Sequence, residues 1–134
     1  MLYLDANVFI YPVLYDGPRS RAATKLLARV ESGKEPAATC ALTFDEVFWV
    51  IARHAGRDAA LRHASLLLGM PHLRVLPVRE VETAVALDFL RQHRKLSPRD
   101  AIHAASSINA GIFTIVSDDS DFDEVPALDR RPLK

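Results

Sequence analysis

Apolar residues follow two different spacings along this chain, and each spacing predicts a different kind of element. Short continuous apolar runs bounded by polar or turn residues are typical of buried strands. The first run covers 1–4 and ends at Asp5. Similar runs predict strands at 37–40, 74–76 and 113–116, and the tail at 127–133 has room for one more. Apolar positions three and four residues apart predict helices at 19–32, 43–55, 58–68, 79–93 and 97–109.

Glycine, proline and hydroxyl residues mark where these helices begin and end. Gly33 and Gly56 follow the first two, in the position that glycine favours after a helix. Ser97 precedes Pro98, and proline fits well at a first helical position. Pro12 lies within the apolar segment 7–15, so we expect only a broken helical turn there.

Strands that alternate with helices imply crossover connections, and therefore a parallel sheet with helices on both faces. Ligands of such folds bind beyond the carboxyl ends of the strands. The chain has 134 residues and contains no repeat or linker long enough to divide it. We therefore expect one domain spanning residues 1–134.

Composition adds mainly exclusions. Seventeen basic residues balance seventeen acidic ones, so net charge identifies no partner and gives no basic excess of the kind nucleic-acid binders carry. The single cysteine, Cys40, lies in an apolar stretch and is expected to be a buried thiol. The first residues do not resemble a signal peptide, and no apolar run approaches the ~20 residues needed to cross a bilayer. These features predict a cytoplasmic protein without membrane contact.

Carboxylates follow the strands in a pattern that the helices extend. Asp5 directly follows the first strand, and Asp118 and Asp119 follow the strand at 113–116. Glu46 and Asp100 lie in the first turns of predicted helices. Helices that follow strands begin near the same sheet edge, which fits Glu46 well and Asp100 less directly, because its helix follows another helix. Each has a structural alternative: Thr43 and Glu46 have capping-box spacing, acids in a first turn favour the helix dipole, and the 118–124 run suits a solvated turn.

Taken together, the four acids indicate a metal site. Two carboxylates at ~4 Å repel by about 4 kcal/mol at an effective dielectric near 20. A cluster of them is therefore tolerated only with bound cations or raised pKa values. Oxygen ligands without a cysteine or a histidine pair suit Mg²⁺ or Mn²⁺ better than Zn²⁺. Hydrolysis by a metal-activated water is the chemistry that such a site supports.

The same motifs resemble those of PIN-domain nucleases. Leu4-Asp5-Ala6-Asn7-Val8 is similar to the opening of that family, and Glu46 follows in order. Pro98-Arg99-Asp100-Ala101-Ile102-His103-Ala104-Ala105 and Val116-Ser117-Asp118-Asp119-Ser120-Asp121-Phe122 continue the pattern. The resemblance covers essentially the whole chain. It implies a PIN-like three-layer α/β/α sandwich with a mainly parallel central sheet of four to five strands.

The resemblance also implies roles for individual residues. Asp5, Glu46, Asp100 and Asp119 would be the catalytic, metal-binding acids, with Asp121 a further metal ligand. Asp118 and Asp121 flank Asp119, so which of the three fills the fourth position stays open. Asn7 and Ser117 would orient Asp5 through hydrogen bonds.

Stand-alone PIN domains of this length look most like VapC-type toxins of toxin–antitoxin pairs. That likeness implies a Mg²⁺-dependent endoribonuclease, with Mn²⁺ as a possible substitute. It also implies an RNA substrate, a cognate antitoxin and a homodimer. Arg94, Lys95 and Arg99 are candidates for RNA phosphate contacts, or form a solvated loop.

Three aromatic residues and one histidine have weaker functional interpretations. Tyr11, Tyr15 and Trp49 could stack on bases or pack against a partner protein, but core packing is the favoured interpretation of Trp49. His103 lies three residues after Asp100 on one helix face, and a packing histidine is favoured over a contact with the acids. The run 47–51 is more apolar than one buried stripe needs, which suggests a groove for an antitoxin helix or a dimer contact.

Two rival functions follow from the same residues. A phosphatase of the haloacid-dehalogenase type needs a second aspartate two residues after the first, where this chain has Asn7. A catalytically silent PIN-fold module that binds RNA or protein would not need the complete set of acids. The sequence therefore favours the metal-dependent nuclease.

Overall fold

The computed structural model describes residues 1–134, which form five strands, six α-helices and one 3₁₀ helix. The strands are β1 (Leu2–Leu4), β2 (Ala37–Cys40), β3 (Leu73–Leu76), β4 (Thr114–Val116) and β5 (Asp129–Arg131). The helices are α1 (Ala6–Leu14), α2 (Pro18–Glu31), α3 (Ala41–Ala55), α4 (Arg57–Leu68), α5 (Glu80–Gln92), α6 (Pro98–Asn109) and the 3₁₀ helix η1 (Ser120–Glu124).

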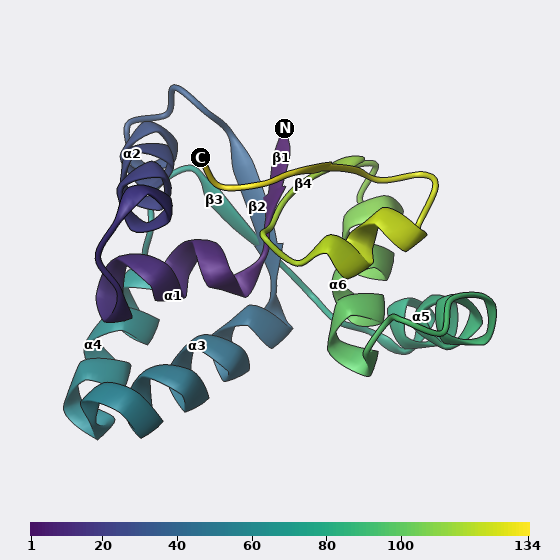
Figure 1. Ribbon diagram of the computed structural model, residues 1–134, viewed down its shortest axis with the longest axis horizontal. Coiled ribbons are helices and arrows are strands. Elements are labelled where there is room, and N and C mark those ends of the chain that lie inside the picture. Colours follow the sequence, from purple (N-terminus) through teal and green to yellow (C-terminus); the bar gives the residue numbers. More distant parts are fainter.

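The strands form a single sheet in the order β3-β2-β1-β4-β5, and every neighbouring pair is parallel. Helices α1 to α4 cover one face, and α5, α6 and η1 cover the other (Figure 1). This arrangement is the predicted three-layer α/β/α sandwich. The chain begins in the central strand, so the first residues after β1 emerge in the middle of the carboxyl-end edge.

Alternate residues of the three central strands, β2, β1 and β4, supply two separate cores. Leu4, Ala37 and Val116 pack with α1 to α4, whereas Tyr3, Ala38 and Ile115 pack with α6 and η1. This alternation is the pattern of a sheet buried on both faces, where successive side chains point in opposite directions. Cys40 belongs to the second core and is a buried free thiol, as expected.

Two local expectations about helices were wrong. Pro12 does not break α1, which runs through it to Leu14, and the Tyr15 amide still donates to the Tyr11 carbonyl at 3.0 Å. The proline removes one backbone donor, and packing of α1 against α2 and α3 outweighs that loss. Thr43 does not cap α3, because the helix begins two residues earlier, with Cys40 at the cap position.

Trp49 is not a core residue. Its side chain is half exposed and lies against the guanidinium of Arg53, which is 4.4 Å from the ring centroid. The buried face of α3 carries Thr43, Val47 and Ile51, at intervals of four residues. Trp49 is two residues from both Val47 and Ile51, so it points to the opposite side of the helix.

No helix combines the length and apolar character required to span a membrane.

Candidate metal centre

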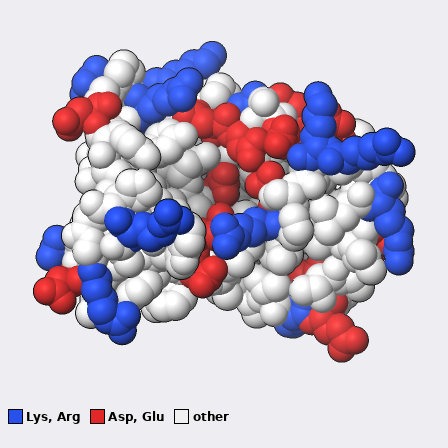
Figure 2. Space-filling model, turned by 60° about the horizontal axis from the view of Figure 1, so that its bottom comes forward, with Lys and Arg blue, Asp and Glu red and all other residues white.

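The predicted acids come together at the carboxyl edge of the sheet. Asp5 and Ser117 follow the neighbouring strands β1 and β4, while Glu46 and Asp100 lie in the early turns of α3 and α6. Viewed onto this edge, acidic side chains form a band between the two helical layers, with basic side chains around it (Figure 2). The topology therefore brings segments from the start, middle and end of the chain to one place.

Asp5 is buried and held by several hydrogen bonds. Its Oδ1 accepts from the Ala6 amide at 2.8 Å, and its Oδ2 accepts from the Ser117 hydroxyl at 2.6 Å. Asn7 Nδ2 donates to Asp5 Oδ2 at 3.3 Å and to Ser117 Oγ at 3.2 Å. The structure thus gives Asn7 and Ser117 the contacts expected of residues that orient Asp5. Burial raises the Asp5 pKa, although His103 and the hydrogen bond from Ser117 act in the opposite direction.

Asp100, Asp119 and Asp121 form the tightest group of acids. One carboxylate oxygen from each can be chosen so that all three lie within 4.8 Å of one another. Burial and the nearby charge of Asp119 raise the Asp100 pKa from 3.8 to about 7. Without a cation, the Asp100 carboxyl therefore holds a proton at pH values where an isolated carboxyl would be ionised. Asp5 and Glu46 lie outside this group of three.

The serine that holds Asp5 also links it to this group. Ser117 Oγ accepts from the Asp119 amide at 3.0 Å, and the Asp119 carboxylate accepts from the Asp121 amide at 2.9 Å. These contacts turn the backbone so that Asp119 and Asp121 both face Asp100. The spacing motif alone favoured Asp119, whereas the geometry presents Asp119 and Asp121 equally.

Asp118 is separate from the acidic group. Its Oδ1 accepts from the Leu133 amide at 2.8 Å, and its Oδ2 lies 3.2 Å from Arg19 Nε. The side chain is only 8% exposed, so it is committed to these two contacts. Asp118 therefore joins the C-terminal segment to α2.

Glu46 reaches the site through His103. His103 Nε2 lies 2.5 Å from Glu46 Oε1 and 3.5 Å from Asp5 Oδ1, and its Nδ1 lies 2.7 Å from the Tyr3 hydroxyl. The ring is completely buried. The favoured interpretation of His103 as a packing residue was therefore wrong, because its ring contacts Glu46 and lies close to Asp5.

Opposing effects set the protonation of this buried group. Burial lowers the His103 pKa, but hydrogen bonds with Cys40 and Glu46 and the charge of Asp5 raise it well above its ordinary value. Burial raises the Cys40 pKa, yet contacts with His103 bring that pKa below its usual value. Burial, followed by the charge of Cys40, raises the Tyr3 pKa well above its usual value. The arrangement therefore favours a charged imidazolium beside Glu46 and Asp5.

The candidate RNA-contacting residues lie on the segment before Asp100. Arg94, Lys95 and Arg99 are all exposed. Lys95 Nζ is 3.7 Å from Glu124 Oε1, while Arg94 and Arg99 form no ion pair. Two exposed guanidinium groups are thus free beside the start of α6.

The donor set fits a hard divalent cation. The group of three acids offers only carboxylate oxygens, and no cysteine or histidine belongs to it. Mg²⁺ and Mn²⁺ prefer oxygen ligands, and Mg²⁺ is commonly held by a few carboxylates with its remaining positions open to other oxygens. A cation here would also relieve the repulsion that raises the Asp100 pKa.

Comparison with known proteins agrees with this fold. The family model described as PIN domain matches residues 2–128. Ribonuclease VapC13 of Mycobacterium tuberculosis is 29% identical over 130 residues, which cover 97% of this chain and 98% of the relative.

Solved structures share the fold at low sequence identity. VapC20 of Mycobacterium tuberculosis, described as a Sarcin-Ricin loop cleaving toxin, superposes with a TM-score of 0.77 and 24% identity. The match covers 92% of this chain and 93% of VapC20. A chain of VapBC2 from Rickettsia felis, bound to a DNA fragment from its promoter, gives a TM-score of 0.76 at 14% identity, with both chains fully covered.

Proposed function

Because the chain belongs to the PIN domain family, we propose that it is a metal-dependent endoribonuclease. The observation that carries this proposal is the group formed by Asp100, Asp119 and Asp121 beside Asp5 at the carboxyl edge of the sheet. The catalytic acids in this proposal are Asp5, Glu46, Asp100 and Asp119, with Asp121 as an additional metal ligand. The proposed domain extends over residues 1–134.

The proposed resident cation is Mg²⁺, for which Mn²⁺ is the natural substitute. A bound divalent cation supplies two things to phosphodiester hydrolysis: a more acidic water and neutralisation of developing negative charge. The protein's own residues do the positioning. Ser117 and Asn7 fix the Asp5 carboxylate, and His103 fixes Glu46. Arg94 and Arg99 are proposed to bind phosphates of the RNA strand on either side of the cleaved bond.

We further propose that the chain is the toxin of a toxin–antitoxin pair. Support comes from its similarity to Ribonuclease VapC13, to VapC20, a Sarcin-Ricin loop cleaving toxin, and to a chain of VapBC2. The proposed partners are a cognate antitoxin and a second copy of the chain, and the proposed location is the cytoplasm, where cellular RNA lies. Co-purification with the product of a small adjacent gene tests the antitoxin.

The test of the nuclease is a single substitution with a matched control. Asp100→Asn removes one charge from the acidic group and is expected to abolish Mn²⁺-dependent cleavage of RNA while the protein stays folded. Asp45→Asn removes an exposed charge next to Glu46 and is expected to leave cleavage within about twofold of the original protein, because it is not part of the group. Mapping of RNA ends by sequencing is the readout.

Two outcomes contradict the proposal. Full cleavage by purified Asp100→Asn protein shows that the activity lies elsewhere or in a contaminant. Absence of Mn²⁺ binding near neutral pH, measured by calorimetry on the unmodified protein, favours instead a PIN-fold module that binds RNA or protein without cutting.

A further inference from the structure

A hollow opens between α1 and α2, next to the acidic site. It has a volume of about 450 Å³ and is lined by Tyr11, Tyr15, Asp16, Pro18, Arg19 and Ser20. Sites for small organic ligands usually measure roughly 300–1,000 Å³. Two rings, one guanidinium and one carboxylate therefore surround a space large enough for a planar heterocycle.

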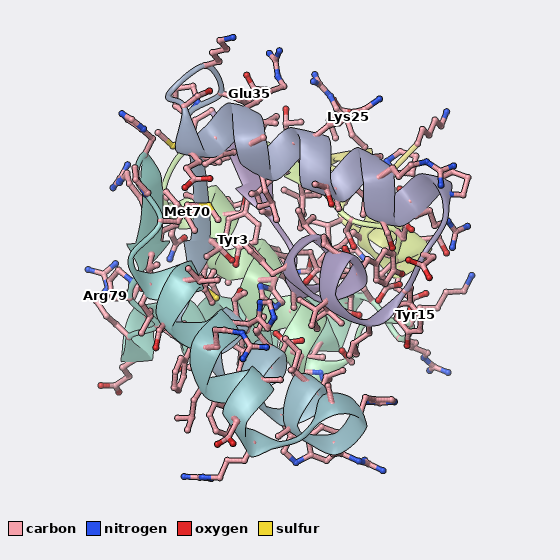
Figure 3. The ribbon with its side chains drawn as sticks, turned by 90° about the vertical axis from the view of Figure 1, so that its left-hand side faces the viewer. Tyr3, Tyr15, Lys25, Glu35, Met70 and Arg79 are labelled. Carbon is pink, nitrogen blue, oxygen red and sulfur yellow. The ribbon has the colours of Figure 1, made fainter.

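The two tyrosines give the hollow a fixed aromatic wall. Their ring centroids are 5.8 Å apart and the ring planes meet at 83°, an edge-on arrangement. The Tyr11 carbonyl accepts from both the Tyr15 amide at 3.0 Å and the Ser20 hydroxyl at 2.9 Å, so the turn between the helices is braced. Tyr15 is nonetheless 53% exposed and lies at the turn between α1 and α2 (Figure 3). An aromatic ring held in place but left open to solvent is available to a stacking partner.

Arg19 places a cation between this wall and the acids. Its Nε lies 3.2 Å from Asp118 Oδ2, and its side chain is 69% exposed, so the terminal amino groups remain open to a ligand. Asp118 directly precedes Asp119, and neighbouring Cα atoms are only about 3.8 Å apart. Burial raises the Tyr11 pKa, and the charges of Asp118 and Asp5 add to that effect, which places Tyr11 within the field of the acidic site.

We infer that this hollow is a nucleobase subsite, in which one unpaired base of a single-stranded RNA stacks on Tyr15 while Arg19 binds an adjoining phosphate. The inference rests on the proposed ribonuclease function. It names RNA because Arg19, which lines the hollow, lies against Asp118, the residue directly before Asp119 of the proposed cleavage site. A base inside a duplex is already stacked on both faces, so only an unpaired base can use an aromatic wall. A guanidinium beside the wall matches the charge of the phosphate that accompanies each base.

The subsite is tested by RNA binding in EDTA, where cleavage does not interfere. The probes are two dye-labelled decamers, one of adenosine nucleotides and one with an abasic sugar at every position, and the readout is fluorescence anisotropy. The original protein is expected to bind the adenosine decamer about tenfold more tightly than the abasic one, in the range of one stacked base. Tyr15→Ala is expected to erase that difference, and Tyr15→Phe to keep it.

Phe113→Ala is the matched control. Phe113 is 51% exposed, similar to Tyr15, but it precedes β4 at the opposite edge of the sheet. We expect Phe113→Ala to retain the preference for the base-bearing decamer. The inference is overturned if Tyr15→Ala leaves that preference intact, or if it lowers the affinity for both decamers by the same factor. The second result would indicate an effect on charge or folding. Cleavage of RNA with Mn²⁺, assayed separately, reports on the nuclease itself, so the two proposals fail by different results.

Discussion

His103 is the residue that connects Glu46 with Asp5 in the acidic site. One ring nitrogen contacts Glu46 and approaches Asp5, and the other contacts the Tyr3 hydroxyl of the central strand. A buried ring with partners on both nitrogens has one orientation available, so it also fixes the orientation of the carboxylates that it contacts. His103 thus acts through Glu46 and Asp5, as a positioning residue.

Replacing this histidine is expected to weaken metal binding and cleavage, although every carboxylate of the site remains. His103→Gln keeps a donor of similar reach but loses the ring, so we expect Mn²⁺ affinity and kcat to fall about 10- to 100-fold, as is usual when a partner of a metal ligand is lost. Calorimetry and initial-rate cleavage measure the two quantities.

A control on the other side of the ring separates positioning from damage to the core. Tyr3→Phe removes only the hydroxyl that meets Nδ1 and keeps the packing volume, so its loss of kcat is expected to be several-fold smaller than that of His103→Gln. Equal Mn²⁺ affinity and equal kcat for His103→Gln and the original protein would show that Glu46 needs no such support.

At the scale of elements, α6 carries Asp100, whose pKa is raised from 3.8 to about 7. Ser97 caps the helix, with its hydroxyl accepting from the Asp100 amide at 3.1 Å, and Pro98 occupies the first position. The cap fixes the backbone at Asp100 and thereby aims its carboxylate toward Asp119 and Asp121. The start of the helix and the proposed metal site therefore share one structure, and Ser97 supports both.

Removing the cap is expected to affect stability and site together. Ser97→Ala should lower the free energy of unfolding by about 1 kcal/mol. It should also weaken Mn²⁺ binding several-fold, because the Asp100 backbone loses its anchor. Ser97→Thr restores a hydroxyl and should recover most of both losses, as measured by urea unfolding and calorimetry. A stability loss with unchanged Mn²⁺ affinity would separate the cap from the site.

The elements show what the pattern of residues could and could not predict. Strands β1 to β4 and helices α2 to α6 were predicted from the spacing of apolar residues, because strands buried between two helical layers form short apolar runs. The residues of β5, Asp129–Arg131, are charged, so the sequence indicated only that the tail has room for a strand. The start of α3 and the exposure of Trp49 were not predicted, since both depend on where β2 ends and which side of α3 meets the sheet. The contact of His103 with Glu46 joins residues 57 positions apart, so no local pattern could predict it.

At the scale of the whole molecule, the acidic site opposes folding of the metal-free protein. Asp100 has a pKa of about 7 in the folded chain, against an ordinary value of 3.8. Between these values the folded state holds more protons than the unfolded state, so stability falls as pH rises. The Asp5 pKa is also raised, and it adds an effect of the same sign.

We therefore expect the free energy of unfolding in EDTA to be ~1–2 kcal/mol lower at pH about 6.5 than at about 4.5, and the melting temperature to be lower accordingly. The effect is no larger because solvent screens the charge of a partly exposed carboxyl. Asp100→Asn should reduce this fall. Mn²⁺ should raise the melting temperature more at the higher pH, since metal binding requires ionised carboxylates. Calorimetric melting at both pH values measures all three effects. A melting temperature that rises with pH in EDTA would contradict the Asp100 pKa.

The hydrogen bond from Ser117 to Asp5 spans 112 residues of sequence. It cannot form until β4 has been made and has paired with β1. During synthesis from the N-terminus, Asp5 therefore emerges long before the serine that orients its carboxylate. The acidic site can form only after the segments that carry Asp5, Glu46, Asp100 and Ser117 have all been synthesised, so no early part of the chain can bind a cation in the way proposed for the folded protein.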